Sequence, residues 1–420
     1  MGDSMAHSAL VDTIHCPPPG SRIAERGSGA LVMCASIPWH FHRNRQQELA
    51  LRLSAFMPVI YVEPPTANGA RPSPRSHSLR TVAKGCYLLP SPKGVPGDRV
   101  IALVNRFVQK RMARSVQAVL STLGCQCSVL WIDRIESAAL IERFPDAITV
   151  YDCADEEWSF GRFCRRSYLH KLEDSLLSRS DLAIASSSTL HRRLSERAPH
   201  VELVPNACDF EHFSRGADDA ARPSDLPPCR SAIIGFIGGV TRRALDHALL
   251  RRLFRLLPGR RFVFVGTADA ASAQMIAAER NAALLGAKDY ADIPAYLAAF
   301  DVAIIPYCVG GRIDYVYPKK LHEYLAAGKP VVATDLPELR RFEGVVRIGR
   351  TPKEFARKIL ECLAENADPA LSARLVAQRR AVAQANTWER RVEHIVTLLD
   401  TELRARGRPS ISESRVNQHA

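Results

Sequence analysis

The sequence predicts an α/β protein with two parallel-sheet domains that face each other across a cleft. Short apolar runs alternate with amphipathic helical patterns twice along the 420 residues, once on each side of a segment rich in Asp, Ala, Pro and Ser. Runs such as 129–132 and 302–305 are apolar throughout, which is typical of strands covered on both faces. A hydrophobic fraction of 46% is sufficient for two separate cores.

The first half of the chain alternates apolar runs with amphipathic patterns. The expected helices lie at 49–56, 99–123 and 163–177, and the expected strands at 31–37, 57–62, 87–89, 129–132, 148–151, 182–185 and 201–204.

The alternation restarts at residue 232. The expected strands lie at 232–237, 262–265, 283–286, 302–305 and 330–333, and the expected helices at 245–257, 270–280, 293–300, 318–327, 354–363, 370–385 and 388–403.

These elements group into domains by composition. Residues without periodicity are expected at both ends, and the last helix is expected to cross back to the first domain. The predicted segments are a disordered leader at 1–28, an acceptor-binding domain at 29–212, a linker at 213–230, a nucleotide-sugar-binding domain at 231–386, a C-terminal helix at 387–404 and a disordered tail at 405–420.

The stretch 317–337, YPKKLHEYLAAGKPVVATDLP, is a complete helix-to-strand unit. Pro318 suits the first turn of a helix, and Gly328 suits the position just after its end. Lys319 and Lys320 lie in the first turn, where cations oppose the helix dipole. A bound anion explains them, and so does a solvated basic turn.

Composition limits the classes of partner. The formal net charge of +13 indicates an anionic partner, which is a phosphorylated substrate, a membrane surface or nucleic acid. No compact nucleic-acid-binding motif is present, so no nucleic acid is expected. The eleven cysteines include no CxxC pair, which favours reduced thiols and a cytoplasmic protein without a metal site. No run of 18 apolar residues or signal-peptide pattern occurs.

Ligands of parallel sheets bind beyond the carboxyl ends of the strands. In the second half, Gly238 and Gly239 follow a strand and permit close approach of the backbone to a ligand. Arg243 and Lys320 offer cations to a diphosphate, and Glu323 can accept hydrogen bonds from sugar hydroxyls. Each feature also has a plain structural explanation, because a Gly-Gly turn often only closes a strand and arginines are commonly surface charges.

In the first half, Asp152 and Asp155 follow a strand, with Glu156 and Glu157 beside them. Clustered carboxylates raise one another's pKa and create a proton acceptor, although Asp155 also suits a helix N-cap. Trp39 and His40 are candidates for lining a sugar site.

The predicted helix 99–123 carries a basic face. Its apolar face suits core packing, and the alternative is contact with an anionic membrane surface. The basic residues are Arg106, Lys110, Arg111 and Arg114.

The segment 318–339, PKKLHEYLAAGKPVVATDLPEL, resembles the donor-site signature of family 4 glycosyltransferases, which have the GT-B fold of two Rossmann-like domains. The collinear segments SIPWHFHRNRQQELALRL, VIYVEPP, VYDCADE, LVPNACDFEHF and IGFIGG extend the resemblance over about residues 30–402. The chain looks most like the branch that includes teichuronic-acid and related bacterial envelope-polysaccharide transferases.

The resemblance implies that the second domain holds a nucleotide-sugar. Glu323 matches the second glutamate of the family's E-x7-E motif, which binds the ribose, and Lys320 lies where this branch places a lysine near the phosphates. Leu321 falls within the same donor segment. Gly238 and Gly239 match the turn that faces the diphosphate, and Arg243 matches a basic position loosely.

The chain departs from the family at the first glutamate of that motif. Tyr315 stands there, with Asp314 beside it, and these two residues and Tyr317 are the candidates for contacting the transferred sugar. Family members retain the anomeric configuration without a protein nucleophile, a metal or a cofactor other than the nucleotide-sugar. Asp152 or Asp155 is then expected to orient the acceptor.

The resemblance implies a hexosyltransferase-type enzyme that moves a sugar from a UDP- or GDP-linked donor to a lipid-linked or polysaccharide acceptor. The expected location is cytoplasmic, at the inner face of the plasma membrane, in envelope or exopolysaccharide biosynthesis. The alternatives are a non-catalytic nucleotide-sugar or glycan-binding relative and a sugar-nucleotide epimerase of the same fold.

Overall fold

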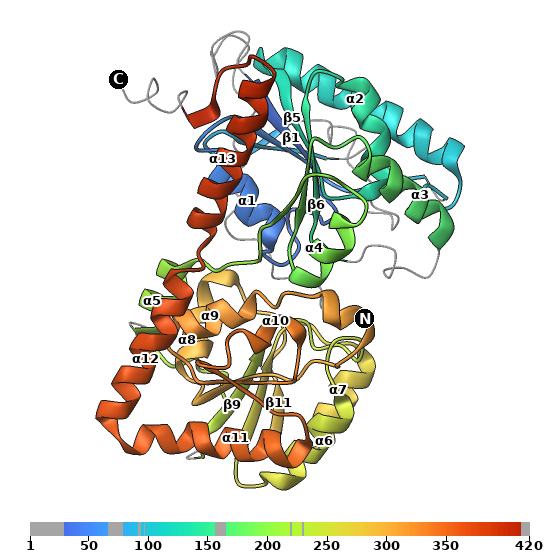
Figure 1. The fold of residues 1–420 in the computed structure, drawn as a ribbon. Coiled ribbons are helices and arrows are strands. Elements are labelled where there is room, and N and C mark those ends of the chain that lie inside the picture. The colour runs from blue at the N-terminus through green and yellow to red at the C-terminus, as the bar shows by residue number, and fades with distance from the viewer. Residues whose placement is uncertain are drawn as a thin grey trace.

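Two α/β domains make up the protein (Figure 1). The computed structural model describes residues 29–65, 79–90, 94–95, 97–155, 165–218, 221–228 and 231–412. The leader predicted at 1–28 and the last eight residues of the predicted tail lie outside these ranges.

The first domain is built on an eight-stranded sheet with the order β3-β4-β2-β1-β5-β6-β7-β8. Only β3 runs antiparallel to its neighbour. The chain turns outward from β1 in both directions, so the strand order reverses between β1 and β5. The strands are β1 (Gly29–Cys34), β2 (Val59–Val62), β3 (Arg80–Ala83), β4 (Cys86–Leu89), β5 (Gln126–Ile132), β6 (Ile148–Cys153), β7 (Leu182–Ala185) and β8 (Val201–Leu203).

Helices cover both faces of this sheet, and the start of α1 (Arg45–Leu53) is fixed by a capping box. The Asn44 side chain accepts from the Arg45 N–H, and the Gln47 side chain accepts from the Asn44 N–H. This cap ends the loop after β1 at a defined place. The other helices are α2 (Ala102–Leu123), the 3-10 helix η1 (Ile135–Arg143), α3 (Arg166–Leu177) and α4 (Ser188–Ser195).

The second domain is built on a six-stranded parallel sheet with the order β11-β10-β9-β12-β13-β14. Renumbered from its first strand, this order is 3-2-1-4-5-6, the arrangement of dinucleotide-binding domains. The strand order reverses between β9 and β12. The strands are β9 (Ile233–Ile237), β10 (Arg261–Val265), β11 (Ala282–Leu284), β12 (Val302–Ile305), β13 (Val331–Ala333) and β14 (Val346–Ile348).

The helices of this domain include α9, which follows β12 and carries the lysine-rich turn. Gly328 follows it with a positive φ of 73°, as predicted for a residue just after a helix. The helices are α6 (His247–Leu256), α7 (Ala270–Ala277), α8 (Ile293–Ala298), α9 (Lys320–Ala326), α10 (Pro337–Arg340), α11 (Pro352–Ala364) and α12 (Pro369–Gln384), and the 3-10 helices are η3 (Tyr290–Asp292), η4 (Gly311–Tyr315) and η5 (Glu365–Ala367).

The chain crosses between the domains twice, and the two crossings are paired. The Cys208 N–H donates to the Asn386 carbonyl, and the Trp388 N–H donates to the Cys208 carbonyl, each at 3.2 Å. After the second crossing, α13 (Trp388–Ala405) packs Trp388 and other apolar side chains into the first-domain core, beside α1 (Figure 1). The predicted return of the last helix to the first domain is therefore confirmed.

Two predicted irregular segments are partly ordered. The linker expected at 213–230 begins inside α5 (Phe210–Asp218), and Phe213 is buried in the second-domain core. The tail expected from residue 405 continues in order to Ser412, because the Asp400 carboxylate accepts from the Ile411 N–H at 2.6 Å and Ile411 is buried. One buried apolar residue anchors each segment.

Candidate functional site

A cavity of about 620 Å³ lies where the second sheet reverses its strand order. The loops after β9 and β10 and the start of α9 form one side of it. The loop after β1 closes it from the first domain, so the cavity lies between the domains. Its lining includes Trp39, His40, Phe41, His42, Arg43, Gly238, Gly266, Thr267, Lys288, Asp289, Tyr290, Lys319, Lys320 and Glu323.

Two glycines allow the backbone to pack closely here. Gly266 has a φ of 139°, and a Cβ on it lies only 2.0 Å from the Gly238 carbonyl oxygen. Gly238 has a φ of 136°, and a Cβ on it lies 3.4 Å from the Lys320 ammonium nitrogen. Both positions therefore require glycine, and the Gly238 backbone lies directly against the lysine.

Lys320 places its ammonium group between the loops after β9 and β12. It donates a hydrogen bond to the Tyr307 hydroxyl and lies 4.7 Å from the Tyr307 ring centre and 5.3 Å from that of Phe236. Its charge thus faces the point where the strand order reverses, the usual position of a ligand in such sheets.

Glu323 lines the same cavity, but its partner is Lys319. The Lys319 ammonium lies 3.1 Å from the Glu323 carboxylate and donates to the Arg43 carbonyl at 2.6 Å. Lys319 therefore connects the ribose-binding candidate to the first domain.

Three other predicted donor residues do not line this cavity. Leu321 is fully buried and belongs to the second-domain core. Gly239 and Arg243 are exposed, and neither lines any of the cavities described here. For these three residues the predicted contact with the donor is not supported by the geometry.

The candidates for sugar contact also point elsewhere. The Asp314 carboxylate accepts from the Gly310 N–H at 3.0 Å, which closes its own turn. Tyr315 packs against the first-domain core. Tyr317 is 2% exposed, and its hydroxyl lies 2.7 Å from His322 Nε2. The family motif assigns positions along the chain and carries no information on the direction of these side chains.

Trp39 and His40 line the interdomain cavity and therefore lie with the donor-site residues. Sequence reasoning did not single out His42 and Arg43 of the same loop. His42 Nε2 lies 3.3 Å from the Thr267 hydroxyl, and the Arg43 guanidinium lies 5.0 Å from the Tyr290 ring centre. His42 and Arg43 could have been predicted from the basic composition of the loop and from its position after a central strand.

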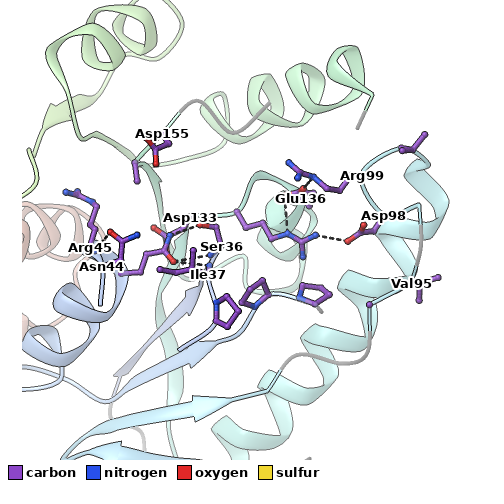
Figure 2. A pocket seen from close by; sticks show the side chains of 18 of the residues that line it. Ser36, Ile37, Asn44, Arg45, Val95, Asp98, Arg99, Asp133, Glu136 and Asp155 are labelled. Carbon is purple, nitrogen blue, oxygen red and sulfur yellow. Dashed lines mark hydrogen bonds and ion pairs between the residues drawn. The ribbon is translucent and has the colours of Figure 1, made fainter. Parts of the chain in front are cut away.

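A second cavity, of about 740 Å³, lies where the first sheet reverses its strand order (Figure 2). The loops after β1 and β5 form two of its sides, and the segment before α2 forms another. Figure 2 shows these loops and Asp155 around the cavity. The lining includes Ser36, Ile37, Pro38, Asn44, Arg45, Pro64, Pro65, Val95, Asp98, Arg99, Val100, Asp133, Arg134, Glu136, Asp155 and Asn206.

Asp152 does not line this cavity, contrary to the prediction that it orients an acceptor. It is 0% exposed, and both carboxylate oxygens accept from Arg45, at 2.9 and 3.0 Å. Arg45 also donates to the Val204 carbonyl at 2.8 Å. The pair is a buried ion pair that joins α1, β6 and β8.

Asp155 does line the cavity. Although the residue is partly exposed, its carboxyl group is surrounded by protein, and this desolvation raises its pKa from the usual 3.8 to about 6. Arg312, from η4 of the second domain, and Arg45 oppose the shift. Of the predicted cluster, Asp155 is therefore the described carboxylate that borders the cavity, while Glu156 and Glu157 lie outside the described residues.

Charges on the far wall of this cavity are paired. Arg134 lies 2.6 Å from Asp98 and 3.2 Å from Glu136, and Arg99 lies 2.5 Å from Glu136 (Figure 2). Within the part of the chain that the structure describes, no group of three or more His, Cys, Asp or Glu side chains is placed to hold a metal ion.

Comparison with known proteins finds similarity at the level of sequence and of fold. The family described as "Glycosyl transferases group 1" matches residues 231–365. The chain is 29% identical over 258 residues to "Putative teichuronic acid biosynthesis glycosyltransferase TuaH" of Bacillus subtilis (strain 168). That match covers 57% of this chain and 63% of the relative, so it spans less than two thirds of the relative's length.

Solved structures match over most of the chain. Sucrose-phosphate synthase from Thermosynechococcus elongatus superposes with a TM-score of 0.69 at 15% identity, covering 90% of this chain and 100% of that one. Anabaena HepE in complex with UDP and glucose superposes with a TM-score of 0.61 at 15% identity, covering 89% and 99%.

At these identities the superpositions establish the fold. They confirm the fold class predicted from the sequence, and together with the sequence matches they confirm the family resemblance. Residues 231–365 match the glycosyl transferases group 1 family, and the chain that carries them has the two-domain GT-B fold.

Proposed function

We propose that the protein is a retaining glycosyltransferase that uses a UDP- or GDP-linked sugar, most simply a hexose. The proposed acceptor is lipid-linked or a polysaccharide, in bacterial envelope or exopolysaccharide biosynthesis. The relative named for teichuronic acid biosynthesis supports this assignment, as does the UDP and glucose complex of the structural neighbour HepE.

The observation that carries the proposal is the position of Lys320. Its ammonium group lies against the Gly238 backbone where the second sheet reverses, and Glu323 follows within one helical turn. A cation beside a close-packed backbone suits a diphosphate, and a carboxylate a few ångströms further suits ribose hydroxyls. The cavity volume of about 620 Å³ lies within the range of small-molecule sites.

In the proposed reaction, an acceptor hydroxyl oxygen bonds to the anomeric carbon on the face from which the nucleoside diphosphate leaves. The bond from that carbon to the diphosphate oxygen breaks, and its electron pair remains on the diphosphate. The acceptor proton moves to a leaving phosphate oxygen. Lys320 stabilises the charge that develops there, which is an electrostatic contribution to the rate. No protein nucleophile or metal takes part in this scheme.

The first-domain cavity is the proposed acceptor site. Asp155 borders it and has a pKa near neutral, so its ionised form is suited to accept a hydrogen bond from the acceptor hydroxyl. We place the enzyme at the cytoplasmic face of the plasma membrane, where a lipid-linked acceptor is accessible. Within the described residues, none of the helices is long and apolar enough to span a bilayer.

A thermal-shift screen of UDP, GDP and ADP, free and sugar-linked, tests the donor site. One of these nucleotides should raise Tm, and the Glu323→Ala variant should lose the shift. Glu343→Ala is the matched control, because Glu343 is an exposed glutamate of the same domain. If Glu323→Ala keeps the full shift, the donor site is assigned to the wrong residues.

A second candidate is a binding protein without transfer activity. It is favoured by Tyr315, which replaces the glutamate of the family motif and packs against the first domain. Turnover of any donor in the presence of an acceptor extract excludes it. Conversion of a free sugar nucleotide without an acceptor indicates the epimerase alternative instead.

A further inference from the structure

The first domain exposes a cluster of large apolar side chains at the start of α2. Val100, Ile101, Leu103 and Phe107 are 38%, 50%, 76% and 55% exposed. Among the described residues, only eight large hydrophobic side chains are this exposed, and half of them fall within these eight positions. Such clustering marks an interaction surface, whereas scattered exposed leucines do not.

The same face of α2 is strongly basic. Arg106, Lys110, Arg111 and Arg114 are exposed, and the 22 residues of α2 include no acidic side chain. Within the described part of the chain, none of these four cations forms an ion pair. Leu103, Phe107, Lys110 and Arg114 are spaced by three or four residues, so they form one stripe.

The start of α3 extends this surface. The Arg165 N–H donates to the Arg99 carbonyl at 3.3 Å, and the Asn105 side chain donates to the Tyr168 hydroxyl at 3.1 Å. These contacts place the exposed Arg165 and Arg166 beside the start of α2. In Figure 1, α2 and α3 lie together on one side of the first domain, away from α13. We call Val100–Arg114 together with Arg165 and Arg166 the basic–apolar surface.

The basic–apolar surface begins at the rim of the first-domain cavity. Arg99 and Val100 line that cavity and directly precede α2. Figure 2 shows Asp98 and Arg99 on the segment that leads into this helix. A molecule bound to the surface therefore lies next to the entrance of the proposed acceptor site.

We propose that the basic–apolar surface docks on an anionic lipid bilayer, with Leu103 and Phe107 inserted among the headgroups. Cations attract the anionic headgroups, and apolar side chains enter the boundary of the acyl chains. Docking in this orientation brings the cavity to the bilayer, so that the polar head of a lipid-linked acceptor enters from the membrane side. This last step rests on the proposed function, whereas the docking itself does not.

Two other partners fit less well. Nucleic acid is held through its phosphates by cations, which leaves the exposed Leu103 and Phe107 without a role. A second copy of the chain, related by a twofold axis, brings the same basic surface against itself. Both are outcomes that the experiment detects.

The experiment measures co-sedimentation of the full chain with vesicles of phosphatidylcholine, with and without phosphatidylglycerol. Binding is expected only with the anionic lipid and should weaken at high salt. Removing three cations should lower the partition coefficient about 100-fold, because each contributes about fivefold. Replacing the two apolar side chains should lower it about 10-fold or more. The variants are Lys110→Gln with Arg111→Gln and Arg114→Gln, and Leu103→Ser with Phe107→Ser.

The matched controls lie on α6 of the second domain, which also exposes three arginines and one leucine. These variants should bind vesicles as the unmodified chain does. They are Arg251→Gln with Arg252→Gln and Arg255→Gln, and Leu256→Ser.

Several results overturn the proposal. If the α2 variants bind vesicles as well as the unmodified chain does, or if only the α6 variants lose vesicle binding, the surface on α2 is contradicted. A gel shift of nucleic acid without vesicle binding indicates a nucleic-acid partner. A dimer of the unmodified chain that the α2 variants do not form indicates that a second copy covers the surface. The nucleotide thermal shift is measured in parallel without lipid. A chain that shifts with UDP or GDP but ignores vesicles refutes the docking surface and leaves the proposed function intact. The reverse result refutes the donor site alone.

Discussion

The two cavities occupy equivalent places in the two sheets but differ in charge. Each lies where its sheet reverses strand order, between β1 and β5 in the first domain and between β9 and β12 in the second. The second-domain cavity is lined by four Lys or Arg side chains and two carboxylates. The first-domain cavity is lined by three arginines and four carboxylates, and most of these charges pair with one another.

This difference supports the proposal that one topology serves two kinds of ligand. A surplus of cations beside glycine backbone suits a diphosphate. Paired charges with one carboxyl of raised pKa suit a neutral, hydroxyl-rich molecule, because the pairs neutralise each other and leave polar atoms to bind hydroxyls. The loop after β1 borders both cavities, with Ser36–Pro38 in one and Trp39–Arg43 in the other. In the proposed reaction it is the element that lies between donor and acceptor.

The largest effect is expected on the free energy of unfolding, at the buried ion pair between Asp152 and Arg45, of which Arg45 lines the first cavity. Asp152→Ala leaves the Arg45 guanidinium buried without its carboxylate, which should lower the free energy of unfolding by about 3–5 kcal/mol. Urea denaturation measures this loss. The exposed pair Glu211–Arg215 is the control, and Glu211→Ala should cost less than about 1 kcal/mol. Equal losses from both variants contradict a structural role for Asp152.

The second-largest effect is expected on nucleoside diphosphate affinity, when the positive charge of the second cavity is reduced. Lys320→Met keeps the apolar part of the side chain against Phe236 and Tyr307 but removes the ammonium group. Nucleoside diphosphate affinity should fall by about 2–3 kcal/mol, or roughly 30- to 150-fold, because a hydrogen bond to a charged group is lost. Calorimetric titration measures it. Lys319→Met should weaken binding less, and the reverse ranking of the two lysines contradicts the assignment.

The third prediction concerns pH and the first cavity. The pKa of Asp155 in the folded protein is about 6, above its usual 3.8, so the folded state holds this proton more tightly. The group therefore favours folding at acidic pH, and that contribution is lost as the pH rises through about 6. Asp155→Asn should raise stability above pH 6 by about 1–3 kcal/mol, with the gap closing below pH 4.

Melting curves of both proteins from pH 4 to 8 test this, and a gap independent of pH contradicts it. If Asp155 accepts a hydrogen bond from the acceptor, transfer by the unmodified enzyme should also rise through pH 6. The Asn variant should lack that rise.

The smallest effect is expected at the contact that joins the two regions. The Glu338 carboxylate of α10 accepts from the Ser188 N–H at the start of α4, at 2.6 Å, and so crosses between the domains. Glu338→Gln should cost about 1 kcal/mol, because the charge at a helix N-terminus is removed. Denaturation should become less cooperative between the domains, whereas Glu343→Gln, at an exposed site, should leave it unchanged.

Sequence reasoning located the sheets and the second cavity because both depend on local patterns. Apolar runs identify buried strands, and the rule that ligands bind beyond strand ends points to Gly238 and Lys320. The edge strand β3 was missed because its four residues are partly exposed and form no apolar run. The helix α5 was missed because it is short and runs directly into a segment rich in Asp, Ala, Pro and Ser, which has the composition of a linker.

The residues of the first cavity were harder to predict from the sequence, because the role of each carboxylate depends on partners that are distant in the chain. Asp152 and Asp155 lie three residues apart and look alike as a pattern. Only the fold brings Arg45, 107 residues earlier, onto Asp152 and leaves Asp155 at the cavity. Likewise, the motif position of Tyr315 carries no information on the direction in which η4 turns its side chain, and Tyr317, which follows η4, is buried by the fold.

The paired crossings at Cys208 and Asn386–Trp388 make the second domain an insertion within the first. The chain enters and leaves the second domain at neighbouring positions. The second domain can therefore be exchanged while the first domain keeps the segments on both sides of it. A chimera that receives residues 210–386, α5 included, from a relative with a different donor should fold and retain its acceptor. In such an architecture, donor and acceptor preferences can evolve as separable modules.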